Sequence, residues 1–163
     1  MRIFSLICGV LLVFSFASPM QAGMEEDCLQ HRDYDLKTDG CTAMIHSGRY
    51  SGRSLAIAYK HRANAYAQLD KYRLAIQDYD EVLRVDPAND LVYNGRGDAY
   101  GSLGEYDRAV KDWEKAIRID GVLATRWWQT KLKMKGHYSG AIDGIFGPGT
   151  RRGLLACARD PNC

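Results

Sequence analysis

The cysteines are the residues of this chain whose type and number most clearly indicate chemistry. Four of the five cysteines lie outside an apolar N-terminal stretch. An even number of cysteines is typical of disulfide-bonded exported proteins, and four cysteines allow three pairings. None of their spacings is the C-x-x-C of a zinc knuckle or a thioredoxin-like redox site, so we expect no metal site. The candidate disulfide residues are Cys28, Cys41, Cys157 and Cys163.

The other residues with catalytic potential do not form the pattern of an active site. The histidines lack a metal-ligand spacing such as H-E-x-x-H. Ser139 lies near His137, but only within one short loop, and no third partner is evident. The acidic stretch from Glu25 to Asp27 fits a solvated first turn of a helix. We therefore expect neither an enzyme nor a cofactor.

The N-terminus has the features of a secretory signal peptide. Arg2 precedes an apolar run from Ile3 to Phe16, which is too short to span a bilayer as a helix. Small residues near Ala22 favour cleavage after that residue, with Ala17 as the rival position. The sequence therefore predicts a signal peptide over residues 1–22, no membrane span after its removal, and a location in a Gram-negative-type periplasm.

The charge of the remaining chain argues against nucleic acid as a partner. Without Arg2, 21 of the 22 lysines and arginines remain against 20 acidic residues. No basic run of five or more residues occurs. Proteins that bind nucleic acid through phosphate contacts carry a marked basic excess, so we expect no nucleic-acid binding.

Two central segments repeat each other at a fixed spacing. Residues 59–87 align without a gap to residues 93–121, and we call the offset from Tyr59 to Tyr93 one period. A fixed period of about 34 residues marks a repeat architecture. The matched pairs are Tyr59 and Tyr93, Ala63 and Gly97, Tyr66 and Tyr100, Tyr72 and Tyr106, Ala75 and Ala109, and Tyr79 and Trp113.

Each repeat reads as two helices. The spacing of Tyr59, Ala63 and Tyr66 is three to four residues, which places them on one helical face. Small residues alternate with aromatic ones on these faces, so that helices approach closely while rings fill the gaps. Asp70-Lys71 and Gly104-Glu105 predict tight turns, and Pro87 predicts the end of a helix.

These residues resemble the tetratricopeptide repeat family from Ala56 to Asp120. A degenerate unit precedes them, in which Tyr34, Cys41 and Met44 take the places of Tyr72, Tyr79 and Val82. Cys28 would lie on the first helix of that unit and Cys41 on the second. A Cys28–Cys41 disulfide would tie this hairpin together, and the alternative is a pair of buried free thiols.

The resemblance implies a protein- or peptide-binding groove on the inner face of each first helix. Lys60 and Asn64 match part of the family's clamp for a C-terminal carboxylate. Asn94 is one place off that pattern, and the basic pair of the third repeat is missing. The expected groove residues are Lys60, His61, Asn64, Asn94, Asp98 and Ser102.

A glycine-rich stretch follows a predicted helix from about Leu123 to Lys135. Trp127 lies one period after Tyr93, so this helix begins as a third repeat would and caps the stack. The sequence predicts that three apolar loop residues pack between this helix and another that begins at Pro148. Those three are Ile142, Ile145 and Phe146. Trp128, Leu132 and Met134 are predicted to add apolar contacts from the first helix.

This stretch looks like the peptidoglycan-binding-like domain of bacterial cell-wall enzymes. The matching positions include Gly136, Tyr138, Gly140, Asp143, Gly144, Phe146, Gly147, Pro148 and Thr150. The family's second half is absent, and a Cys157–Cys163 bridge would close the chain instead. The candidate peptidoglycan-binding residues are Tyr138, Asp143, Arg151 and Arg152, because tyrosine stacks on sugars and arginine pairs with carboxylates.

The sequence as a whole predicts an all-α protein, a short tetratricopeptide solenoid that continues into a small C-terminal helical unit. The expected divisions are a signal peptide at 1–22, a degenerate hairpin at 23–55, two repeats at 56–121 and a capping unit at 122–163. The expected function is a non-catalytic periplasmic scaffold that binds a protein partner in the groove and peptidoglycan through the C-terminal unit. The alternative is a chaperone-like or assembly adaptor in which that unit is only a structural cap.

Overall fold

The protein is all-α, as predicted. The computed structural model describes residues 19–30, 32–160 and 162–163, and these form eight helices. The expected apolar run of the signal peptide lies outside the described residues, and α1 crosses the expected cleavage position after Ala22. The helices are α1 (Pro19–Leu29), α2 (Tyr34–His46), α3 (Gly52–Gln68), α4 (Tyr72–Val85), α5 (Asp90–Ser102), α6 (Tyr106–Asp120), α7 (Val122–Met134) and α8 (Pro148–Arg159).

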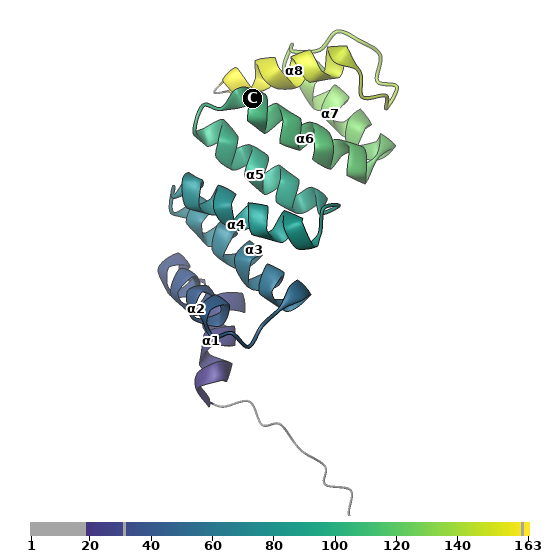
Figure 1. Ribbon diagram of the computed structural model, residues 1–163. Helices are drawn as coiled ribbons and strands as arrows, with labels where there is room; N and C mark the ends of the chain where they lie inside the picture. The colour runs from purple at the N-terminus through teal and green to yellow at the C-terminus, as the bar shows by residue number, and fades with distance from the viewer. Residues whose placement is uncertain (1–18, 31, 161) are drawn as a thin grey trace, which may run out of the picture.

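Consecutive helices pair into hairpins, and the hairpins stack in chain order. Figure 1 shows α1 and α2 at one end, α3 to α6 in the middle, and α7 and α8 at the other end. Each hairpin packs its first helix on the second helix of the preceding hairpin, α3 on α2 and α5 on α4. No helix in the described part of the chain combines the length and apolar composition needed to cross a bilayer.

The turns within the two repeats lie where the sequence predicts them. Asp70 has a φ of 56° and Gly104, one period later, has a φ of 75°, so the same left-handed turn recurs. Such a conformation costs glycine little, while aspartate tolerates it. The second helix of the first repeat ends at Val85, before Pro87, which confirms the predicted stop.

Aromatic rings of the two neighbouring helices, α4 and α6, pack closely against glycines of α5. A Cβ on Gly95 would lie 2.7 Å from the Tyr79 hydroxyl, and one on Gly97 would lie 2.7 Å from the Trp113 ring. Tyr79 is buried, in a cluster with Ala63, Ala75 and Val82. These contacts confirm the predicted alternation of small and aromatic residues.

Buried ion pairs recur in both repeats and were not predicted. Arg62 donates from Nε and Nη2 to both carboxylate oxygens of Asp78, at 2.7 and 2.8 Å. Arg96, one period later, makes the same two bonds to Asp112 at the same distances. Both carboxylates are almost fully buried, with 6% and 7% of their side chains exposed. Two parallel bonds to a carboxylate are the strongest geometry that arginine offers.

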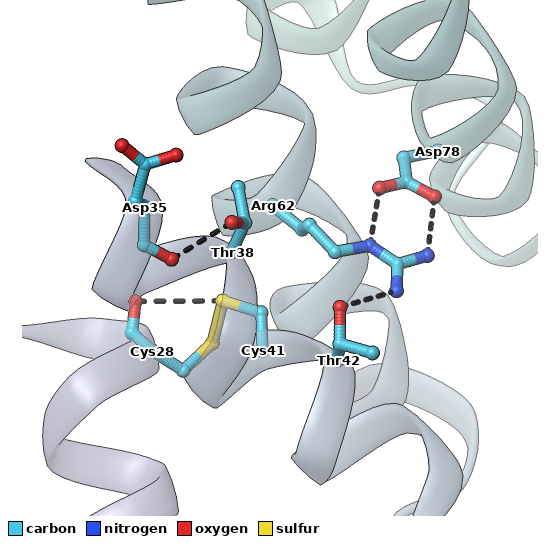
Figure 2. Close-up of polar contacts among 7 residues, drawn as sticks. All are labelled: Cys28, Asp35, Thr38, Cys41, Thr42, Arg62 and Asp78. Atoms are coloured by element: carbon cyan, nitrogen blue, oxygen red, sulfur yellow. Dashed lines mark hydrogen bonds and ion pairs between the residues drawn. A yellow bond between two sulfur atoms is a disulfide. The ribbon is translucent and has the colours of Figure 1, made fainter. Parts of the chain in front are cut away.

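Each of these arginines also reaches back to the preceding hairpin. Arg62 donates from Nη1 to the hydroxyl of Thr42 on α2, at 3.0 Å (Figure 2). Arg96 makes the corresponding contact with the carboxylate of Asp80 on α4. Each arginine therefore joins three helices, two of its own hairpin and one of the preceding hairpin.

A disulfide holds the first hairpin together. Cys28 on α1 is bonded to Cys41 on α2, with 4.4 Å between their Cα atoms, and both residues are fully buried (Figure 2). This is the pairing that the sequence favoured. The two helices approach so closely at Gly40 that a Cβ there would lie 2.5 Å from the Asp27 side chain.

The C-terminal unit differs from the prediction in how its loop is held. Ile142 is 43% exposed and Ile145 is 69% exposed, so the prediction that they pack between two helices is wrong. Phe146 does pack in the cluster of Val110, Leu132 and Leu154. The prediction of an inward contact for Met134 is also wrong, because this residue is 83% exposed on α7.

Gln129, and not these two isoleucines, anchors the loop to α7. Its side chain on α7 is fully buried, and Nε2 donates to Asp143 Oδ1 at 2.8 Å and to the Ile145 carbonyl at 3.1 Å. Its Oε1 accepts from the backbone N–H of Gly144 at 2.9 Å. A single amide therefore satisfies two backbone groups of the loop, the Gly144 N–H and the Ile145 carbonyl, which cannot be buried without partners. The loop then leads into α8 at Pro148, the predicted position.

Candidate partner-binding groove

A cleft of about 500 Å³ is lined by residues of α2, α3, α4 and α5. We call it the central cleft. Four of the six predicted groove residues line it, namely His61, Asn64, Asp98 and Ser102. Lys60 instead lines a neighbouring depression with Arg53 and Ile57, and Asn94 lines neither.

Two equivalent hydrogen bonds fix polar side chains that line the central cleft. The Tyr79 hydroxyl donates to Asn64 Oδ1 at 2.7 Å, and Trp113 Nε1 donates to Asp98 Oδ1 at 2.9 Å. The two donors are one period apart, and so are the two acceptors, so this is one feature repeated. Burial, with a smaller contribution from the Asp98 charge, raises the pKa of Tyr79 to about 12, so the phenol stays protonated and donates.

Opposite charges meet in the central cleft. Partial burial lowers the pKa of His61, and the positive charges of Lys60 and Lys37 lower it further. Restricted access of water raises the pKa of Asp98, while the bond from Trp113 and the charge of Lys131 oppose that rise. The α2–α3 side of the cleft is therefore cationic, and the α5 side carries one carboxylate.

A second compartment of about 420 Å³ continues the groove toward the C-terminal unit. It shares Asp98 and Ser102 with the central cleft. The rings of Trp113 and Trp128 stack there, with 6.3 Å between their centroids. The disulfide between Cys157 and Cys163, with a Cα–Cα distance of 5.2 Å, forms part of the wall.

Several lining residues were not predicted. Lys37 comes from α2, which the sequence analysis assigned to an irregular hairpin without groove residues. Gln68 lies on α3 beyond Asn64, the last groove residue predicted on that helix. Trp128 and Lys131 come from α7. The repeat gives no signal for the last two, because they lie one period after Asn94, which lines neither cleft, and Gly97, which packs against Trp113.

The candidate peptidoglycan-binding residues are mostly engaged within the protein. The Tyr138 hydroxyl donates to the Ala141 carbonyl at 2.8 Å, and the residue is half-buried. Asp143 accepts from the Ile145 N–H and from Gln129, and these two bonds lower its pKa. Arg151 pairs with Glu114 at 3.6 Å.

Arg152 and Ser139 are exposed, as are Asp143 and Arg151 despite their contacts within the protein. Arg152 lies on the open side of α8. The His137 ring pairs with Asp160 rather than with Ser139, with 2.9 Å between Nε2 and Asp160 Oδ2. His137 therefore links the glycine-rich loop to the segment that follows α8.

Comparison with protein families agrees with the repeats seen in the structure. One family model, described as TPR repeat, matches residues 63–104, and another, described as Tetratricopeptide repeat, matches residues 91–121. Both matches end before α7. No curated protein matches the chain. Residues 63–121 therefore match tetratricopeptide repeats in sequence, and the structure stacks them as helical hairpins.

Proposed function

We propose that this protein is a non-catalytic scaffold that binds a protein or peptide partner in the central cleft. The observation that carries the proposal is the pair of repeated hydrogen bonds, Tyr79 to Asn64 and Trp113 to Asp98. They hold an amide and a carboxylate in fixed positions at the surface of the groove. Preorganised polar groups of this kind lower the cost of ordering side chains on binding.

The cleft suits an extended segment better than a small molecule. Its lining is a mixture of hydrogen-bonding groups and short apolar side chains, from Ala65 and Ala67 to Gln68 and Ser102. Small-molecule sites are mostly apolar and enclosed. Repeat proteins use the continuous inner surface of the stack for extended partners.

Site-specific photo-crosslinking tests this proposal. A photoreactive amino acid replaces Gln68 in the cleft or, as the control, Arg73 on the exposed surface of α4. We expect a defined crosslinked product from position 68 only, which mass spectrometry identifies. Loss of that product in His61→Glu, with the fold intact by circular dichroism, would support the cleft as the site. Equal crosslinking from both positions would contradict the proposal.

We propose that the protein acts in the periplasm. The proposal is supported by the signal-like N-terminal sequence and by the two disulfides, Cys28–Cys41 and Cys157–Cys163, which form in oxidising compartments. Cell fractionation with thiol labelling checks it. We expect an osmotic-shock fraction that contains the protein without reactive thiols, and recovery as a reduced cytosolic protein would contradict the proposal.

Peptidoglycan binding by the C-terminal unit is the second candidate function. The exposed guanidinium of Arg152 favours it, whereas the internal bonds of Tyr138 and Asp143 favour a structural cap. Sedimentation with insoluble peptidoglycan separates the two. Pelleting that is lost in Arg151→Ala/Arg152→Ala would support wall binding. A folded protein that stays in the supernatant would assign the unit to capping.

A further inference from the structure

Exposed apolar side chains gather at the C-terminal end of the stack. Half or more of the surface of each of five large side chains there is open to solvent. They are Val122 (58%), Leu123 (79%), Trp127 (59%), Met134 (83%) and Ile145 (69%). Exposed apolar residues that occur singly need no explanation, but a cluster of this kind marks an interaction site.

Three of these residues form one stripe along α7. Leu123, Trp127 and Met134 are four and seven residues apart, which places them on the same face of a helix. Gly144 lies against Val122 and Arg126, so the loop that carries Ile145 extends the cluster beside the stripe. We call Leu123, Trp127 and Met134 the α7 stripe, with Val122 and Ile145 beside it.

The stripe is exposed because the repeat is interrupted after α7. Trp127 lies two periods after Tyr59, which packs against the core of its own hairpin. In the repeats, the next helix follows after a short turn and covers this side. After α7 the chain instead enters the glycine-rich loop, and α8 packs across α6 and α7 (Figure 1).

Cations flank the stripe on both sides. Arg126 and Lys133 are seven residues apart on the face next to it, and Lys131 lies on its other side, with Nζ 5.7 Å from the Trp127 ring. Residues 121–142 contain four lysines and arginines and no acidic residue; Asp120 and Asp143 bound this stretch. The surface therefore combines apolar area with a local positive charge.

We propose that the α7 stripe docks this protein on the surface of an anionic lipid bilayer. A leucine, a tryptophan and a methionine flanked by lysine and arginine are the composition of a helix that lies in the membrane interface. Tryptophan favours that depth, and long basic side chains reach from it to the headgroups. Anionic lipids add attraction for each basic residue near the surface.

The shape of the surface favours a bilayer over an acidic protein. Leu123, Trp127 and Met134 line none of the clefts described above. A protein partner would fill a depression around its anchoring side chains. A projecting stripe instead fits a soft, planar surface. The inference is independent of the partner in the central cleft, because the stripe and the cleft share no residue.

Vesicle flotation tests the proposal. The exported form of the chain, beginning at Gly23, is mixed with vesicles of phosphatidylcholine alone or of phosphatidylcholine with phosphatidylglycerol. We expect flotation with the anionic vesicles, a blue shift of tryptophan emission, and loss of binding as salt is raised. Leu123→Ser/Trp127→Ser should weaken binding by about tenfold or more and abolish the shift.

Matched control variants distinguish binding through the α7 stripe from nonspecific hydrophobic or electrostatic binding. Leu91→Ser removes a leucine that is 68% exposed on α5, and it should leave binding unchanged. Arg126→Ser/Lys133→Ser should weaken binding severalfold, whereas Lys111→Ser/Lys115→Ser on α6 should not.

Three results would overturn the proposal. They are the absence of flotation, equal binding to neutral vesicles, and an equal loss in Leu91→Ser. A stripe variant that keeps vesicle binding but no longer pellets with insoluble peptidoglycan would assign the stripe to the wall instead.

Discussion

The middle of the stack and its two ends are held together by different means. In the middle, Arg62 and Arg96 each bind a buried carboxylate and reach the preceding hairpin. At the N-terminal end, a disulfide joins α1 to α2. At the C-terminal end, the amide of Gln129 holds the glycine-rich loop.

The difference follows the period of the repeat. Helix α1 contains no arginine, and Thr130 lies one period after Arg96. The arginine is therefore present only in the two middle hairpins, each of which has a neighbour on both sides. A terminal unit packs on one side only and gains less from its neighbours. The ends of this stack are held by local bonds that need no neighbour.

Among changes to the middle of the stack, Arg96→Ala is expected to cause the largest loss of stability. It leaves the buried carboxylate of Asp112 and that of Asp80 without their cation. We expect the free energy of unfolding to fall by about 3–5 kcal/mol, measured by urea denaturation. Arg62→Ala should cost less, because its third partner is the neutral hydroxyl of Thr42. A loss equal to that of Arg108→Ala, an exposed pair worth under about 1 kcal/mol, would refute the clamp.

Cys28→Ser/Cys41→Ser tests whether the N-terminal end depends on its covalent bond. The disulfide closes a short loop, for which chain entropy predicts about 3 kcal/mol. We expect the loss to be confined to α1 and α2, as faster amide hydrogen exchange in those helices. If α5 and α6 exchange equally faster, the first hairpin and the middle form one cooperative unit, and the comparison drawn above is wrong.

Gln129→Leu tests the C-terminal end. The substitution keeps the volume but leaves the Gly144 N–H and the Ile145 carbonyl without a partner. We expect a loss of about 1–3 kcal/mol and faster hydrogen exchange across the loop, residues 140–147. Thr130→Ala, the exposed neighbour on α7, is the control and should change neither quantity. An unaffected loop in Gln129→Leu would mean that Phe146 and Thr150 alone hold it.

The smallest expected effect concerns the charge at the border of the first two hairpins. Lys37→Ala removes a cation that lowers the pKa of His61, so the pKa should rise toward 6.5, which proton NMR measures. With a folded pKa below the unfolded one, His61 contributes stability that is complete above pH 6.5 and is lost as the pH falls through the folded pKa. Lys37→Ala should reduce that acid loss. Because burial is the larger cause, the pKa should not return fully, and Lys111→Ala should leave it unchanged.

The repeats could be predicted because they depend on local chemistry. Asp70 and Gly104 make turns, Pro87 ends a helix, and small residues face rings at a fixed spacing, all of which are visible in one sequence. The ion pairs of Arg62 and Arg96 were missed although they too repeat. Helical spacing alone does not show whether a charged residue is exposed or paired across two helices.

The C-terminal site residues were harder to assign because their roles depend on contacts across the fold. Ile142 and Ile145 are of a residue type that is usually buried, yet their side chains are exposed to solvent. Glutamine is a residue type that is usually exposed, yet Gln129 is fully buried. A glycine-rich loop has backbone groups that need hydrogen bonds, and an amide supplies these while an isoleucine does not.

One repeat position shows what the sequence determined and what only the tertiary structure decided. His61, Gly95 and Gln129 follow one another at intervals of one period, and of these the sequence analysis predicted only His61 as a groove residue. His61 lines the central cleft, and Gly95 leaves room for Tyr79. Gln129 is covered because the loop after α7 folds back over it. Period and turn chemistry are local and set the helices, whereas burial at a given position depends on what the rest of the chain packs against it.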